Sequence, residues 1–131
     1  MSRFSDPRQR RHDGVMHAAA VSFDLHIPQS RSLKAKRAVI RPIVEGLRNR
    51  FRVSVAEVAH HDQWQRAEIA IAVVGESEHR VVELLDAAER FIVGAPDIEL
   101  LEVTTSWLES EGETSGGVGG RPGRRSGVDP W

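Results

Sequence analysis

The sequence predicts an α+β domain in which two amphipathic helices pack on one face of a four-stranded antiparallel sheet. Four segments alternate apolar and polar residues as half-buried strands do, and two segments repeat apolar residues with the period of a helix. These segments follow one another in the order βαββαβ, and 131 residues is a normal length for one domain.

The first predicted strand covers residues 16–27. Every second residue in it is apolar, and these residues are Ala19, Val21, Phe23, Leu25 and Ile27. Such alternation places one face of the strand against a core. Pro28 ends the strand, because proline has no amide hydrogen for the ladder.

The first predicted helix covers residues 33–51, and Ser32 before it is a suitable N-cap. Its apolar residues recur at helical spacing, and they are Leu33, Ile40, Ile43, Val44, Leu47 and Phe51. Pro42 removes the hydrogen bond to the carbonyl of Ala38, so we expect a bend there.

The second and third strands are predicted at 53–58 and 66–74, with a turn at 60–63 between them. The third strand alternates strictly, and its inward residues are Ala67, Ile69, Ile71 and Val73. These two strands therefore form a hairpin in which the third strand contributes most of the apolar surface.

The second helix is predicted from Ser77 as N-cap to Val93, because Gly94 follows as a stop signal. Its inward residues are Val81, Leu84, Leu85, Ala88, Phe91 and Ile92. The last strand covers 98–108, and in it Leu101, Val103, Thr105 and Trp107 are expected to share one face. This order is the ferredoxin-like arrangement, in which the first and third strands are central.

Three segments make up the predicted organisation. Residues 15–109 form the ferredoxin-like domain, because all the periodic segments fall within this range. Residues 1–14 are polar and arginine-rich, and residues 110–131 are rich in glycine and arginine. We expect both terminal segments to be disordered, because neither has a periodic apolar pattern.

The composition excludes several kinds of chemistry. The chain has no cysteine, which excludes disulfides, thiol catalysis and cysteine-ligated metals. It has neither an apolar run of about 18 residues nor a secretory signal, so we expect a cytoplasmic protein without membrane contact. We find no nucleophile with a base and no glycine-rich phosphate loop. We therefore expect no enzyme, no catalytic residues, no cofactor and no small-molecule substrate.

His60, His61 and Asp62 are residue types that bind metals. Adjacent side chains in a turn seldom point at one ion, and no second cluster of ligands supports them. We therefore expect surface histidines here and no metal site.

Charge is strongly segregated along the chain. Residues 31–52 carry eight lysines or arginines and one acid, whereas 67–113 carry twelve acids and two arginines. Most cations of the first helix fall on one flank of a helical wheel, beside the buried stripe. The candidate anion-binding residues are Lys34, Lys36, Arg37, Arg41, Arg48 and Arg52. We predict salt-sensitive binding to RNA phosphates; the alternative is that these side chains pair with acids of the second helix.

The sheet face away from the helices is the second predicted surface. Its central positions are Ala18, Ala20, Ser22, Ala70, Ala72 and Val74. Because none is aromatic, we do not expect bases to stack there as in RNA-recognition domains. Ala18, Ala20, Ala70 and Ala72 are instead candidates for a partner interface, and two such faces packed together would make a homodimer. The alternative is an ordinary exposed face.

Trp64 and Arg66 lie at the hairpin of the second and third strands. A tryptophan beside an arginine can anchor a protein partner. The alternative, which the small number of aromatic residues favours, is that Trp64 caps the core. Trp107 in the last strand is expected to pack in the core or at the sheet edge.

Three stretches in series resemble the YlxP-like family of small bacterial proteins, and the resemblance covers residues 15–109. They are 32–37 (SLKAKR), 49–58 (NRFRVSVAEV) and 62–67 (DQWQRA). The resemblance implies a ferredoxin-like fold and no known activity. Genes of this family often lie near translation and ribosome-maturation genes, and this position suggests a role around RNA or the ribosome. The sequence departs from the family pattern at 59–61 (AHH). Glu57 could be catalytic only within a buried polar cluster, and we expect a hydrogen-bonded edge residue instead.

Overall fold

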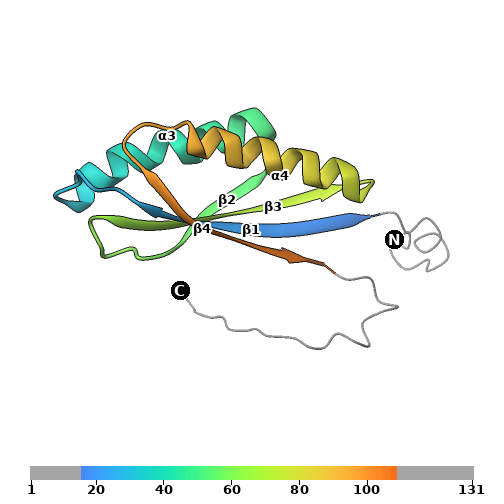
Figure 1. Cartoon of the computed structure of the whole chain (residues 1–131), viewed down its shortest axis with the longest axis horizontal. Helices are drawn as coiled ribbons and strands as arrows, with labels where there is room; N and C mark the ends of the chain where they lie inside the picture. Colours follow the sequence, from blue (N-terminus) through green and yellow to red (C-terminus); the bar gives the residue numbers. More distant parts are fainter. Residues whose placement is uncertain (1–15, 109–131) are drawn as a thin grey trace, which may run out of the picture.

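The computed structural model describes residues 16–108, and Figure 1 shows two helices lying on one side of a twisted sheet. The elements are β1 (His17–His26), α3 (Leu33–Phe51), β2 (Ser54–Ala59), β3 (Arg66–Gly75), α4 (Glu78–Val93) and β4 (Glu99–Trp107). Their order is the predicted one. The segments 1–14 and 110–131 lie outside the described residues. Within 16–108, no helix is long and apolar enough to cross a membrane.

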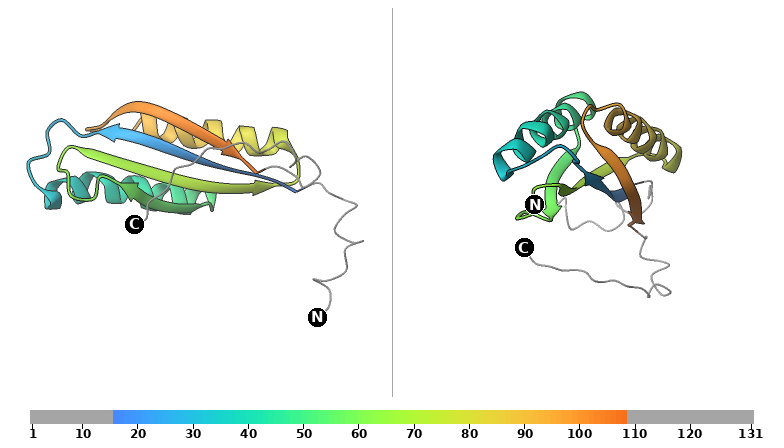
Figure 2. Two further views of the ribbon diagram at one scale, coloured as in Figure 1. Left: turned by 90° about the horizontal axis from the view of Figure 1, so that it is seen from below. Right: turned by 60° about the vertical axis from the view of Figure 1, so that its left-hand side comes forward.

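The strand order in the sheet is β2-β3-β1-β4, and all three pairings are antiparallel. This confirms the ferredoxin-like α+β fold with β1 and β3 at the centre. Figure 2 shows that both helices cover the same face of the sheet and leave the other face open. We call this other side the open face.

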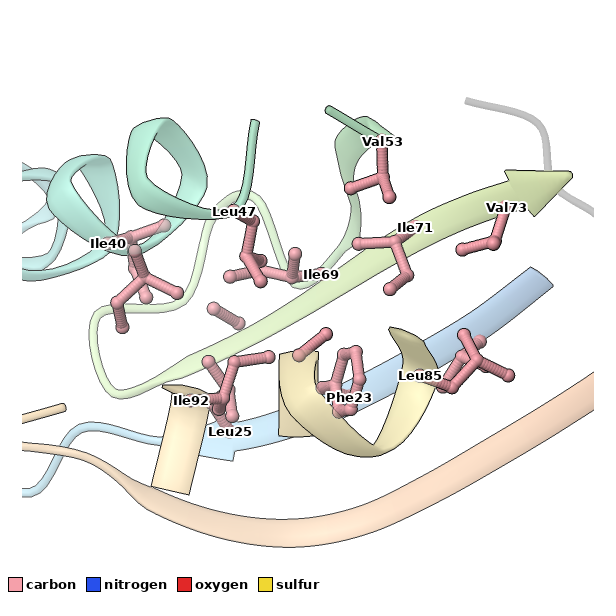
Figure 3. Packing of buried hydrophobic residues seen from close by; sticks show 14 of the residues in the cluster. Phe23, Leu25, Ile40, Leu47, Val53, Ile69, Ile71, Val73, Leu85 and Ile92 are labelled. Carbon is pink, nitrogen blue, oxygen red and sulfur yellow. The ribbon is translucent and has the colours of Figure 1, made fainter. Parts of the chain in front are cut away.

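The core lies between the sheet and the two helices (Figure 3). Both central strands alternate as predicted, and their buried residues are Ala19, Val21, Phe23, Leu25, Ala67, Ile69, Ile71 and Val73. The helices contribute Ile40, Ile43, Leu47, Val81, Leu85, Ala88 and Ile92. Burial of these side chains is the main stabilising term, at about 1.5–3 kcal/mol for each large one.

Both helices begin at the predicted serine caps. The hydroxyl of Ser32 accepts the amide of Ala35 at 3.0 Å, and that of Ser77 accepts the amide of Arg80 at 3.1 Å. Each bond satisfies an amide that has no partner within its helix. Helix α3 continues through Pro42 to Phe51 as one element.

The two helices approach closely at Gly46. A Cβ atom at this position would lie 2.3 Å from Cζ of Phe91, so the ring of Phe91 occupies the space a side chain would need. Phe91 also packs edge-to-face on Phe51, with 6.0 Å between the ring centroids. Glycine therefore sets the separation between α3 and α4 at this contact.

The face prediction for β4 is wrong at its start. The register between β1 and β4 shifts between Asp24 and Leu25, which marks a bulge. Leu100 lies opposite Leu25 and packs against the core, while Leu101 is exposed. A bulge adds one residue to a strand and so reverses the alternation beyond it. Trp107 lies opposite Ala19 on the edge strand and is partly exposed.

Candidate functional site

Helix α3 presents the predicted cations on one side of the molecule. Five of them are exposed, and they are Lys34, Arg37, Arg41, Arg48 and Arg52. Spacings of three, four and seven residues return to the same side of a helix. This spacing places Lys34, Arg37, Arg41 and Arg48 on one side of α3, whereas Arg52 follows the helix as its C-cap with a φ of 54°.

A surface groove with a volume of about 320 Å³ lies between α3 and the edge strand β2. Arg37, Arg41 and Arg48 line it, and the apolar Ile40 and Val44 lie between them on the helix. The lining is completed by Lys36 and Glu45 of the helix and by Ala56 and Glu57 of the strand. We call this feature the α3–β2 groove. It is a narrow channel with three arginines and an apolar wall.

The exposed cations of α3 are not neutralised by acids within the described residues. No carboxylate of residues 16–108 lies within 4.0 Å of Lys34, Arg37, Arg41, Arg48 or Arg52. The ion pair of α4 lies within that helix, between Arg80 and Glu83 at 4.0 Å. The alternative, in which the cations pair with acids of the second helix, is not what the structure shows.

One arginine of the groove also closes the sheet edge. Nη2 of Arg48 donates to the carbonyl of Val55 at 3.2 Å. His61 Nε2 lies 3.1 Å from the carbonyl of Glu57, two residues further along the same edge. These side chains occupy outward carbonyls of β2 and so protect an edge that is otherwise open to another strand.

Lys36 does not belong to the exposed set. Only 2% of its surface is accessible, because it lies on the side of α3 that faces the sheet. Its Nζ donates to the carbonyls of His60 at 2.9 Å and Arg66 at 3.1 Å. The same atom lies 3.3 Å from Oε2 of Glu57. Lys36 is therefore a buried tie between α3 and the hairpin of β2 and β3, and it cannot reach an external phosphate.

Glu57 lies at the edge of the sheet, as predicted, but on the side facing the helices. It is opposite the buried Ile69 in the register of β2 and β3. The prediction of a hydrogen-bonded carboxylate is wrong for its buried Oε2, which has no hydrogen-bond partner and is compensated by the charge of Lys36. The charged side chain beside Glu57 is thus Lys36, whose hydrogen bonds go to backbone carbonyls.

The motif stretches meet at one end of the molecule. Nε2 of Gln65 donates to the carbonyls of Pro28 at 3.2 Å and Ser30 at 3.1 Å. Nη2 of Arg66 donates to both carboxylate oxygens of Asp24 at 2.9 and 2.8 Å. The loop before α3, the start of the helix and the hairpin are held together by these bonds. Most of the motif is therefore explained by stability of the fold.

Trp64 does not cap the core. Its side chain is 53% exposed and lines a shallow hollow of about 710 Å³ beside the hairpin. His26, Arg66 and Leu101 also line this hollow. Trp64 is thus available to a partner, and Arg66 is oriented by Asp24.

The open face carries the alanines predicted from the alternation. Its central pairs are Ala18 with Val74, Ala20 with Ala72 and Ser22 with Ala70. Val74 is 70% exposed and Leu108 is 61% exposed at the same end of the sheet. The face is apolar at this end.

The histidines of the 59–61 turn contact neighbouring groups individually. His60 Nε2 lies 3.8 Å from Oδ1 of Asp24, while His61 contacts the carbonyl of Glu57. Across the described part of the chain, no three His, Asp or Glu side chains are placed to hold one metal ion.

Comparison with known proteins agrees with the resemblance seen in the sequence. Residues 18–105 match the model of a family described as "Protein of unknown function (DUF503)". The "Uncharacterized protein YlxP" of Bacillus subtilis (strain 168) is 38% identical over 77 residues, which cover 59% of this chain and 84% of that protein. The matched range contains every described helix and nearly all of the sheet. The chain therefore belongs to the DUF503 family of proteins of unknown function.

Proposed function

We propose that this protein is a non-catalytic accessory protein that binds RNA or ribosomal particles through the α3–β2 groove. The observation that carries the proposal is the row of Arg37, Arg41 and Arg48, exposed along one groove. No carboxylate of residues 16–108 lies within 4.0 Å of these arginines, although Glu45 and Glu57 also line the groove. Residues 31–52 hold eight cations and the single acid Glu45, whereas cations and acids are ordinarily interspersed on a protein of net charge −1.

The dimensions of the row suit a phosphate backbone. Eleven residues separate Arg37 from Arg48, which corresponds to about 16 Å along a helix axis. Several phosphates of one strand fit in that length. Guanidinium groups bind phosphate oxygens in a bidentate manner and remain charged at any physiological pH. The expected binding is therefore electrostatic and weakly dependent on sequence.

The rest of the molecule favours recognition of the backbone over recognition of bases. The central positions of the open face are alanine, serine and valine, so they offer no aromatic ring for a base. The apolar wall of the groove, formed by Ile40 and Val44, can contact a ribose or the edge of a base. The gene association implied by the family resemblance adds support for a role near the ribosome.

Co-sedimentation with ribosomes and with bulk RNA, at low and at high salt, tests this function. The wild-type protein is expected to sediment with the particles at low salt and to dissociate as salt increases. The variant Lys34→Gln/Arg37→Gln/Arg41→Gln/Arg48→Gln is expected to stay in the supernatant at both salt concentrations. Equal sedimentation of the variant and the wild type would exclude the groove as the binding site.

A further inference from the structure

The open face has a row of three carboxylates, of which the fold neutralises only the central one. Glu68 and Glu102 lie on either side of Asp24 in the register of β3, β1 and β4. Like charges directly opposite one another on a sheet are destabilising. Arg66 pairs with Asp24, but no cation of residues 16–108 lies within 4.0 Å of Glu68 or Glu102. We call Glu68, Asp24 and Glu102 the carboxylate row.

The surface next to the carboxylate row suits an arginine-containing peptide. The hollow lined by Trp64 and Leu101 begins at His26 and Arg66, two residues beyond Asp24 and Glu68 along the same strands. On the other side of the row lies the apolar end of the face, with Val74 and Leu108 exposed. Carboxylates bind guanidinium groups, and an exposed tryptophan stacks on them.

A second copy of this face does not complement the carboxylate row. If a twofold axis ran along the strands, the row of one copy would face the row of the other. If the axis ran across the strands, the carboxylates would be buried against Ala18 and Ala20. The first arrangement is repulsive, and the second removes charges from water without a partner.

The chain itself contains a segment that ends in a basic cluster. Residues 109–131 follow Leu108, whose amide donates to the carbonyl of Ala18 at 2.9 Å at the margin of the open face. This segment carries Glu109, Glu111 and Glu113, then four glycines, and then Arg121, Arg124 and Arg125. Its positive charge is therefore confined to the part beyond the glycines, and the segment leaves the sheet at the apolar end of the open face.

The length of the segment matches the distance it has to cover. Leu108 and Glu102 are six residues apart on β4, or about 20 Å along a strand. Thirteen to seventeen residues separate Leu108 from the three arginines, and glycine-rich chains of this length have end-to-end distances of about 20–25 Å. The basic cluster near the N-terminus is less suited to reach the carboxylate row. Arg10 and Arg11 precede Met16 by six and five residues and would have to be fully extended to reach Asp24.

We propose that the open face is the docking surface for this chain's own segment 109–131, with Arg121, Arg124 and Arg125 on the carboxylate row. The glycines pass over the alanines, where a side chain would hold the peptide away from the sheet. The segment shields the exposed apolar end of the sheet, and a basic peptide from another protein would have to displace it.

Paramagnetic broadening measured by NMR tests this proposal in the full chain. The sequence has no cysteine, so Ser126→Cys gives a single position for a nitroxide label. The amides near Asp24, Glu68 and Glu102 are expected to lose most of their intensity, while those of α3 keep theirs. Intensity is expected to return at high salt. The absence of broadening on the open face at low salt would refute the proposal.

Two variants with matched charge separate this contact from general attraction. Arg121→Glu/Arg124→Glu/Arg125→Glu is expected to abolish the broadening, whereas Arg8→Glu/Arg10→Glu/Arg11→Glu is expected to retain it. Adding Glu68→Lys/Glu102→Lys to the first variant is expected to restore it. Equal broadening in both triple variants would contradict the assignment to the arginines.

A mixed sample distinguishes a segment of the same chain from a segment of a second copy on the open face. When ¹⁵N protein without a nitroxide is combined with nitroxide-labelled ¹⁴N protein, an intramolecular contact leaves the ¹⁵N signals sharp. Broadening in that mixture would show that the segment of a second copy occupies the face, and would rule out docking within one chain. A dimer that buries the open face even in the Arg121→Glu/Arg124→Glu/Arg125→Glu variant would show that the second copy's own sheet covers it.

Discussion

Nζ of Lys36 lies 3.3 Å from Oε2 of Glu57, in a position where neither atom has ready access to water. The same ammonium donates to the carbonyls of His60 and Arg66. One side chain thus joins the first helix to both strands of the β2–β3 hairpin. The shape of the α3–β2 groove depends on this contact, because Lys36 and Glu57 both line the groove.

Lys36→Met is therefore expected to lower the free energy of unfolding by about 2–4 kcal/mol, because it leaves two carbonyls and a buried carboxylate oxygen without their cation. Urea denaturation measures this loss. Lys34→Met is the matched control, since Lys34 is exposed two residues away, and its effect is expected to stay within about 0.5 kcal/mol. Equal losses in the two variants would contradict the structural role of Lys36.

The sequence contained the signal for the burial of Lys36. Lys36, Ile40, Ile43 and Leu47 follow the spacing of one helix face, and the last three were predicted to be buried. The segregation of charge instead placed Lys36 among the predicted anion ligands of the first helix. Helical periodicity was the better guide, because it reports geometry directly.

Gly46→Ala tests the contact between the helices. The added methyl group would lie 2.3 Å from Cζ of Phe91, so the ring has to move and lose its packing on Phe51. We expect a net loss of about 1–2 kcal/mol in thermal unfolding, although alanine favours a helix over glycine by about 1 kcal/mol. Gly94→Ala is the control, because its nearest neighbour is at 3.4 Å. Stabilisation by Gly46→Ala would contradict the close approach.

Gln65→Leu tests the attachment of the hairpin to the loop before α3. Two bonds from Nε2 are lost, and the carbonyl of Ser30 belongs to a buried residue, so we expect a loss of about 1–2 kcal/mol. Hydrogen exchange is expected to increase at the amides of residues 29–32. Gln63→Leu is the matched control, since its Nε2 makes a single long contact of 3.4 Å with His60. Unchanged exchange in the Gln65 variant would show that this loop is held by other contacts.

The fold could be predicted almost completely from the sequence, because alternation, helical spacing and the two serine caps all report local geometry. The exchange of Leu100 and Leu101 could not be predicted, since a bulge adds a residue without changing the apolar pattern. The exposure of Trp64 also required the structure. Its position at a turn did not show whether the ring would fold back on the core or lie outside it.

The candidate site could be predicted in part. The flank of Arg37, Arg41 and Arg48 follows from helical geometry, but the groove beside it depends on the position of β2 across the chain. The pairing of Arg66 with Asp24 likewise joins residues 42 positions apart. Contacts of this kind arise from strand order, which a single sequence indicates only indirectly.

The salt dependence of RNA binding, measured by fluorescence anisotropy on a labelled single strand, is the most direct test of the proposed function. Arg37→Glu/Arg41→Glu is expected to weaken binding and to reduce the slope of log K against log salt by roughly 1.4, the value for two lost contacts. Arg80→Glu/Arg90→Glu, which changes the net charge equally on α4, is expected to keep the wild-type slope. Identical slopes for the wild type and Arg37→Glu/Arg41→Glu would contradict RNA binding by the α3–β2 groove.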